Sequence, residues 1–105
     1  MEADSAVDGD LQFAWDRRKA AENRRKHRTS FEEAETVFSD DNALLLADPE
    51  HSEEEDRFVL LGLSERLRFL VVVHTLRDGG DTIRIVSARK GTRREQRQYF
   101  DRLTP

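Results

Sequence analysis

The chain has 105 residues, of which 38% are charged and 36% apolar, and its formal net charge at pH 7 is −4. This length allows one small domain with a single core, and the absence of cysteine excludes a disulfide framework, thiolate chemistry and a cysteine-based zinc site. The longest apolar run, at 69–73, is too short to span a bilayer, and the first residues lack a secretory signal pattern, so we expect a cytoplasmic protein.

The charged residues are sorted into blocks along the chain. Seven Lys or Arg and one acid lie within 17–28, eleven acids and no Lys or Arg lie within 30–56, and eleven bases against five acids follow from 57 onward. Two basic segments that meet in space would form a positive surface, which is typical of proteins that bind polyanions. Solvated faces and salt-bridge partners would explain the same blocks, and charge alone leaves both interpretations open.

The predicted elements begin with a short strand at 11–15, where apolar and smaller or polar residues alternate. A helix capped by Asp16 should follow and run to about Arg28. Its aliphatic side chains are two alanines, so we expect its buried face to include Asn23 and His27. Because an unpaired buried polar group costs roughly 1–3 kcal/mol, such a face should make specific hydrogen bonds.

The next segment predicts a second helix with an apolar stripe. Ser30 and Glu33 have the spacing of a capping box, and a turn signal ends the helix near Ser39. A short apolar strand is expected at 43–47. The acidic segment at 48–56 contains a proline and should form an exposed loop.

Three strands are predicted next, at 57–63, 67–75 and 82–89, joined by hairpin turns at 64–66 and 78–81. The second turn contains two glycines, which supply the positive φ angles that a tight turn needs. Short consecutive antiparallel strands flanked by helices indicate an α+β domain with a meander sheet.

A C-terminal helix completes the prediction. Thr92 and Glu95 have capping-box spacing, and Tyr99, Phe100 and Leu103 form its apolar stripe. The expected organisation is therefore an acidic flexible tail at 1–10 and one domain at 11–103, with two N-terminal helices, an antiparallel meander and a C-terminal helix.

This succession of residues resembles the BrnT family, the toxins of type II toxin–antitoxin pairs. The likeness is carried by Phe13, Ala14, Trp15, Asp16, Lys19, Asn23, Lys26, His27, Ser30–Ala34, Val37, Phe38, Asp48, His51, Ser52, Glu55, Arg57, Val71, Val72, Thr75, Ile83–Arg89, Glu95 and Tyr99. No single motif is specific, but the order and spacings match over roughly 11–100. Family members usually carry glycine at the position that Arg28 occupies here.

The resemblance implies a RelE-like fold and a ribonuclease that stops growth when unopposed. It also implies a ribbon-helix-helix antitoxin, similar to BrnA, that covers the toxin and represses the shared operon. We expect a toxin2–antitoxin2 assembly that contacts operon DNA through the antitoxin.

Metal-independent RNA cleavage needs a base for the 2′-hydroxyl, donors for the charge that builds on the phosphate, and an acid for the leaving oxygen. Arg89 is the first candidate for the phosphate clamp, because it lies at a strand exit just before a helix N-terminus. The alternative is that it serves as a salt-bridge partner of Glu95. Arg84 is five residues away, so regular alternation would place it on the opposite face.

Arg57, His74 and Arg84 are candidate catalytic residues as a group. If neighbouring strands supply Arg57 and His74 to the face of Arg84, a positive pocket with one titratable imidazole results. A lone histidine in an apolar strand is more often a satisfied structural residue, and this alternative stays open for His74.

Candidate RNA-binding residues are Lys26, His27, Lys90, Arg93 and Tyr99. For His27 a helix-capping role is the alternative, and for Tyr99 a core position is. Exposed aromatic residues are scarce, so we expect weak sequence preference or positioning by a larger assembly such as the ribosome.

We expect no metal and no cofactor. His51 and the three glutamates at 53–55 form a cluster that fits no standard ligand spacing, and a solvated acidic loop explains it better.

The sequence thus favours a metal-independent endoribonuclease toxin that inhibits translation and growth and is neutralised by its antitoxin. A non-catalytic module that binds nucleic acid or an acidic partner is the alternative, and a structural subunit whose basic surface docks an acidic antitoxin segment is a third.

Overall fold

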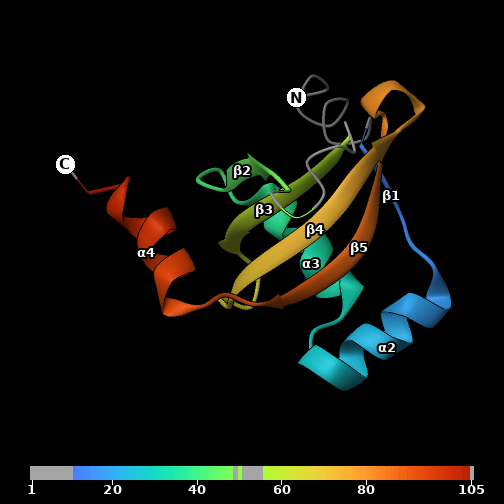
Figure 1. Cartoon of the computed structure of the whole chain (residues 1–105), viewed down its shortest axis with the longest axis horizontal. Coiled ribbons are helices and arrows are strands. Elements are labelled where there is room, and N and C mark those ends of the chain that lie inside the picture. The colour runs from blue at the N-terminus through green and yellow to red at the C-terminus, as the bar shows by residue number, and fades with distance from the viewer. Residues whose placement is uncertain (1–10, 49, 51–55, 105) are drawn as a thin grey trace.

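The computed structural model describes residues 11–48, 50 and 56–104 (Figure 1). Within them lies one five-stranded sheet with the strand order β1-β5-β4-β3-β2. The strands are β1 (Gln12–Ala14), β2 (Leu44–Ala47), β3 (Arg57–Leu63), β4 (Phe69–Arg77) and β5 (Thr82–Lys90). The helices are α2 (Arg17–His27), α3 (Phe31–Thr36) with a 3-10 turn at Val37–Ser39, and α4 (Arg93–Asp101); a second 3-10 turn covers Asp78–Gly80.

Strands β2 to β5 form the antiparallel meander that the sequence predicts. The prediction of an all-antiparallel sheet is wrong at one edge, where β1 pairs parallel with β5 and Phe13 lies opposite Ile83. These two strands are about seventy residues apart, so local sequence patterns carry no information on their pairing.

The two faces of the sheet have different covers. We call the face that contains Leu61, Val71 and Tyr99 the α4 face, and the face that contains Leu70 and Val72 the α3 face. Figure 1 shows β4 and β5 passing in front of α3, with α4 standing to one side of the sheet and α2 beyond β5. Helix α3 therefore covers one face, and among the described helices only α4 packs on the other.

The main core lies between α3 and its face of the sheet. Phe31, Ala34 and Val37 form the predicted stripe and are fully buried against the sheet. Ser30 caps α3 by accepting a hydrogen bond from the Glu33 backbone N–H. The predicted capping box is incomplete, because the Glu33 carboxylate accepts instead from Ser64 and Arg68 of the β3–β4 hairpin.

Helix α2 runs along the part of β5 that β1 leaves unpaired. Its buried Asn23 accepts from the Ala88 N–H and donates to the Ala88 carbonyl, so one side-chain amide replaces a strand partner. This confirms the expected hydrogen-bonding role of Asn23. The burial expected for His27 is wrong, since its side chain is exposed. The helix ends at Arg28, whose φ of 53° is left-handed.

A β-bulge in β5 determines which face of the sheet each side chain of this strand lies on. Ile85 lies opposite His74 and Ser87 lies opposite Val73, so Val86 is an extra residue between two ladder positions. The alternation along β5 shifts by one residue at this point. Arg84 and Arg89 therefore share the α4 face, and the prediction from regular alternation that they point to opposite faces is wrong.

Helix α4 begins with the capping box of Thr92 and Glu95 that the sequence predicts. Tyr99 is 1% exposed, packs on Phe69 and donates a hydrogen bond to Asp40. The rest of the expected apolar stripe of α4 is largely exposed.

The expected tail at 1–10 lies outside the described residues, as does most of the loop expected at 48–56. Asp48 is described, and it is 6% exposed instead of solvated. No helix in the described part of the chain combines the length and apolar character needed to cross a bilayer.

Candidate active site

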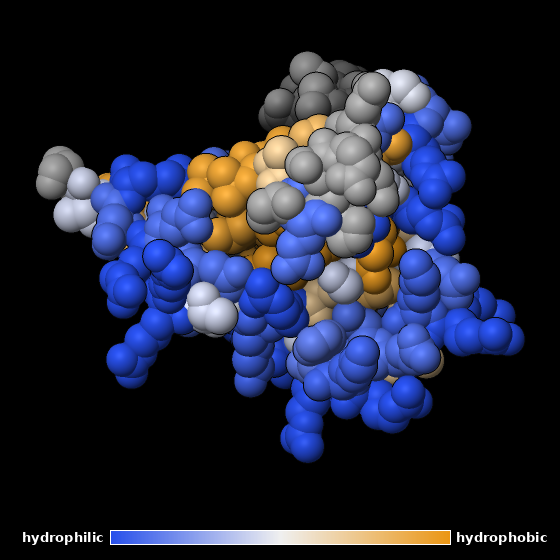
Figure 2. All heavy atoms as spheres, viewed as in Figure 1, coloured by the Kyte–Doolittle hydropathy of each residue, from blue (hydrophilic) through white to orange (hydrophobic). Residues whose placement is uncertain are grey.

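An open hollow of about 490 Å³ lies on the α4 face. Its lining residues are Leu46, Ala47, Asp48, Glu50, Arg57, Val59, Leu61, Val71, Val73, Ser87, Arg89, Glu95 and Gln98. Valines and leucines of the central strands form its floor, and charged or polar side chains stand around them. Figure 2 shows this apolar floor in orange, bordered by hydrophilic side chains. The hollow therefore combines an apolar base with ionic groups, as ligand sites commonly do.

Arg89 lies near the end of β5, and its side chain lines the hollow. Its two terminal nitrogens donate to the two carboxylate oxygens of Glu95 at 2.9 and 2.8 Å, and one of them also donates to the Lys90 carbonyl at 3.1 Å. The hydrogen bonds that Arg89 donates to Glu95 raise the pKa of Arg89, so the guanidinium stays charged. A guanidinium has five N–H donors, so two remain for a ligand among the described contacts.

Glu95 holds this arginine and caps α4 at the same time. One of its carboxylate oxygens accepts from the Thr92 N–H at 2.8 Å as well as from Arg89. The hydrogen bonds from Arg89 lower the pKa of Glu95 to about 2, against the effect of burial. The alternative that pairs Arg89 with Glu95 is therefore correct, and the pair faces the hollow instead of being hidden from it.

Arg57 lies at the start of β3 and enters the same hollow. Its Nε donates to the Asp48 carboxylate at 2.9 Å. Asp48 also accepts from the Glu50 N–H, which orders the chain directly after β2. The hollow thus contains two arginines, each oriented by a carboxylate of another segment.

Arg84 shares the face but not the hollow. It lies opposite Thr75, which in turn lies opposite Arg57, so the three residues form a row across the strands. Arg84 is not among the residues that line the hollow. The Thr75 hydroxyl is buried and has no hydrogen-bond partner among the described residues.

His74 is placed differently from the predicted pocket. It lies on the α3 face, 2% exposed, between the rings of Phe38 and Phe58. Burial lowers the pKa of His74 below 6.5, so the imidazole is neutral at pH 7. The expectation that it shares a face with Arg57 and Arg84 is wrong, because His74 pairs with Phe58 and Arg57 pairs with the next residue.

Two of the predicted RNA-binding residues lie beside the hollow. Lys26 and His27 line a shallow groove between α2 and the bulge of β5, together with Lys19, Val86 and Ser87 among others. Ser87 lines both this groove and the hollow. The groove therefore continues the hollow across the edge of β5.

The other three RNA-binding candidates do not line the hollow. Lys90 and Arg93 are exposed at the junction of β5 and α4. Tyr99 is in the core, and burial together with its hydrogen bond to Asp40 raises its pKa to about 12. Its expected place in the RNA interface is wrong, and the core alternative is correct.

Sequence reasoning missed Ser87 and Asp48 as parts of the site. Ser87 faces the hollow because of the bulge in β5, and no residue of β5 predicts that bulge. Asp48 carried a usable signal, since it is an acid directly after an apolar strand and lies nine positions before Arg57.

Among the described residues, no group of three or more His, Cys, Asp or Glu side chains is placed to hold a metal ion. The cluster of His51 with the glutamates at 53–55 lies outside the described residues.

Comparisons with known proteins define the class first. Residues 15–95 match the model of a family described as the ribonuclease toxin, BrnT, of type II toxin–antitoxin systems. The crystal structure of the Brucella abortus ribonuclease toxin BrnT is similar to this fold, with a TM-score of 0.61 and 20% identity over 79% of this chain and 99% of that chain. The search of curated proteins found no match.

The chain is thus a type II ribonuclease toxin by its family, and the family match extends over most of its length. It belongs to the BrnT family, which confirms the resemblance found in the sequence. The structural likeness, at this low identity, supports the fold.

Proposed function

We propose that the hollow on the α4 face is where this chain cleaves RNA, by a reaction that needs no metal ion. The observation that carries this proposal is the pair Arg57 and Arg89, which come from opposite ends of the sheet and line one hollow. Arginine suits a phosphodiester because its planar donors grip two phosphate oxygens at once.

In the proposed reaction the 2′-hydroxyl loses its proton and attacks the neighbouring phosphorus, the bond between phosphorus and the 5′-oxygen breaks, and a 2′,3′-cyclic phosphate forms. The leaving 5′-oxygen takes a proton from water or from the group that accepted the 2′-proton. The two unengaged donors of Arg89 and the charge of Arg57 stabilise the negative charge that builds on the phosphate oxygens. The carboxylates of Asp48 and Glu95 hold these arginines in place before RNA binds, so the site is organised in advance.

A proton acceptor for the 2′-hydroxyl is present at the hollow. Glu50 is exposed there, and its charge acts on Arg89, whose pKa it helps to raise. We assign the acceptor role to Glu50, with the imidazole of His27 in the adjoining groove as the second candidate.

The RNA chain on either side of the cleaved bond should follow the basic residues around the hollow. Lys26 and His27 offer one path along α2, while Lys90 and Arg93 offer contacts near α4. Arg84 lies farther along the same face and adds to its positive field. These contacts are to the backbone, which fits a weak sequence preference.

The biological setting follows from family membership and the chemistry of the site. RNA cleavage inhibits translation and growth, and the antitoxin that a type II toxin requires is, in our proposal, a BrnA-like ribbon-helix-helix protein. A toxin2–antitoxin2 assembly would contact operon DNA through that protein. We also propose that the fold is RelE-like.

Cleavage of a labelled RNA in excess EDTA tests this proposal. The purified chain should cut the RNA and leave 2′,3′-cyclic phosphate ends. Arg89→Ala should lower the single-turnover rate by about a hundredfold to a thousandfold, as loss of one transition-state donor does in other enzymes.

Arg94→Ala is the matched control, since Arg94 is an exposed arginine in the first turn of α4 and does not line the hollow. It should cut at the rate of the unaltered chain. Equal rates for all three proteins, or cutting that stops in EDTA, would contradict the proposal. Circular dichroism and melting curves establish that each variant is folded.

A further inference from the structure

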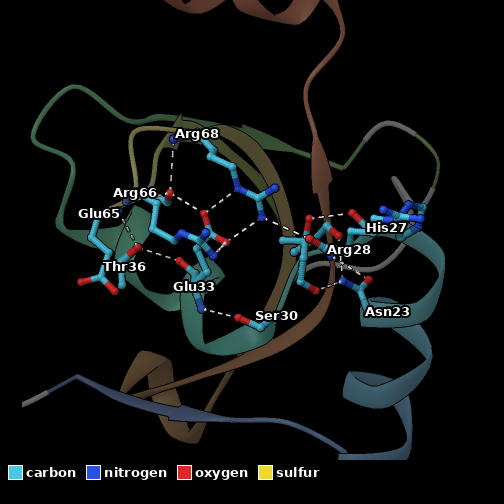
Figure 3. A network of polar contacts seen from close by, with 12 residues as sticks. Asn23, His27, Arg28, Ser30, Glu33, Thr36, Glu65, Arg66 and Arg68 are labelled. Carbon is cyan, nitrogen blue, oxygen red and sulfur yellow. Dashed lines mark hydrogen bonds and ion pairs between the residues drawn. The ribbon is translucent and has the colours of Figure 1, made fainter.

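A second polar cluster lies on the other side of the sheet, at the tip of the β3–β4 hairpin (Figure 3). At its centre is the Glu33 carboxylate, which is 5% exposed. It accepts from two nitrogens of Arg68 at 2.6 and 2.9 Å and from the Ser64 hydroxyl at 2.6 Å. Arg68 also donates to the Arg28 carbonyl at 3.2 Å. These bonds hold the hairpin tip against the turn between α2 and α3.

The hairpin tip is also fixed at a second point. The Glu65 N–H donates to the Thr36 hydroxyl at 2.9 Å, and the Thr36 hydroxyl donates to the Glu33 carbonyl. The hydrogen bonds from Arg68 and Ser64 lower the pKa of Glu33. The buried acid is therefore ionised and its charge is balanced by Arg68.

Beside this balanced pair lies a hollow of about 320 Å³ with an excess of positive charge. Arg24, Arg28, Ser30, Glu33 and Arg66 line it. Arg24 and Arg28 form no salt bridge with any described residue, and the Arg66 side chain is 71% exposed with its nitrogen 3.9 Å from Glu33. Because Glu33 is already matched by Arg68, three guanidinium groups at this hollow are left without a full counter-charge.

Two backbone positions here are left-handed in the turns that they form, Arg28 at the end of α2 and Leu67 in the β3–β4 hairpin turn. Arg28 has a φ of 53° and Leu67 a φ of 62°, and both side chains are exposed, Leu67 by 78%. A left-handed conformation is less favourable for a residue with a side chain, and glycine normally occupies such positions. Neither side chain packs in the core, so core packing does not offset the unfavourable backbone conformation. Both side chains are therefore available at the surface.

We propose that this hollow and the adjacent Leu67 form a docking site for an acidic segment of a protein partner, one that carries an apolar side chain among its carboxylates. The three arginines complement the acids, and Leu67, which follows Arg66 in the hairpin turn, offers an exposed apolar side chain. The rigid hairpin tip lowers the entropy lost on binding.

RNA fits this surface less well than an acidic peptide does. No aromatic side chain lines the hollow, so unpaired bases have nothing to stack on there. Glu33 and its partners also lie on the α3 side of the sheet, whereas the arginines of the proposed cleavage site lie on the α4 face. Docking here is therefore independent of the proposed function, and its test requires no cleavage.

The probe is a short fluorescein-labelled peptide of glutamate and leucine, titrated with the full chain and followed by fluorescence anisotropy. Arg24→Ala combined with Arg66→Ala should weaken binding about tenfold, since each exposed ion pair contributes up to about 1 kcal/mol. The matched control combines Arg94→Ala with Arg97→Ala, two exposed arginines of α4 that lie outside this hollow. It should change binding less than twofold.

Leu67→Gly tests the apolar part of the site. It should weaken the glutamate–leucine peptide severalfold, leave a glutamate–serine peptide unchanged, and raise the melting temperature because the left-handed strain is relieved. Three results would overturn the proposal: no peptide binding, equal weakening by both double variants, or an oligouridylate that binds through Arg24 and Arg66 while the peptide does not.

Discussion

Carboxylates act on the arginines of this protein in two different ways. Glu33 is buried and accepts hydrogen bonds from two nitrogens of Arg68, so this pair is a structural tie between the hairpin and α3. Glu95 grips Arg89 at the edge of an open hollow and leaves two donors of the guanidinium directed elsewhere. The same chemical pair thus serves stability in one place and the orientation of a candidate catalytic group in the other.

His74 makes stability depend on pH. Burial lowers its pKa below 6.5, so the unfolded chain takes up a proton at a higher pH than the folded chain does. This contribution to stability is fully present above about pH 6.5 and is lost as the pH falls toward the lower pKa of the folded state. The loss cannot exceed about 1.4 kcal/mol per pH unit for one group.

The variant His74→Phe should remove this pH dependence, because a phenyl ring can pack between Phe38 and Phe58 without titrating. Urea unfolding at pH 7.5 and at pH 5.5 measures it, as the difference between the two free energies of unfolding. The control His27→Gln, at an exposed histidine, should keep the difference of the unaltered chain. If His74→Phe also keeps it, the imidazole is not the group responsible.

At the level of secondary structure, the junction between β5 and α4 depends on a glycine. The Gly91 N–H donates to the Phe69 carbonyl at 3.0 Å, and a Cβ atom on Gly91 would overlap the Phe69 ring. This close approach sets the direction in which α4 leaves the sheet, and with it the position of Glu95 relative to Arg89.

The substitution Gly91→Ala should destabilise the chain by about 1–3 kcal/mol, the usual cost of overpacking. It should also slow RNA cleavage, because Glu95 moves with α4. Adding Phe69→Leu makes room for the new methyl group and should restore part of both losses. Chemical denaturation and the cleavage assay measure the effects; a single variant with full stability and full activity would rule out this role of Gly91.

Local patterns predicted most of the elements, since caps, turns and apolar periodicity are properties of neighbouring residues. Ser30, Thr92 and the glycines of the second hairpin turn all occupy the predicted positions. The bulge at Val86 and the parallel pairing of β1 depend on distant strands, and no local signal reports them. For that reason the sequence correctly placed Arg57 on the face of Arg84, but it misplaced Arg84 relative to Arg89 and His74 relative to these arginines.

Across the whole molecule, the charge blocks serve two purposes: some of their residues form internal ion pairs and hydrogen bonds, and others form basic surfaces. Three acids of the acidic block point inward to a basic or polar partner: Glu33 to Arg68, Asp40 to Tyr99, and Asp48 to Arg57. The interpretation as salt-bridge partners is therefore correct for part of this block. The basic segments gather in two places, the hollow of the α4 face with its groove along α2, and the hollow beside the hairpin tip.

In the mechanism that we propose, Arg57 and Arg89 together hold the phosphate at the cleaved bond. The most direct test follows the arginine Nε–Hε signals by NMR during titration with an RNA whose 2′-hydroxyl is methylated at the cleavage position, so that it binds without being cut. We expect the signals of Arg57 and Arg89 to shift together and to saturate at the same RNA concentration, while those of Arg94 and Arg97 stay in place. Shifts confined to Arg24 and Arg66, with Arg57 and Arg89 unmoved, would contradict it.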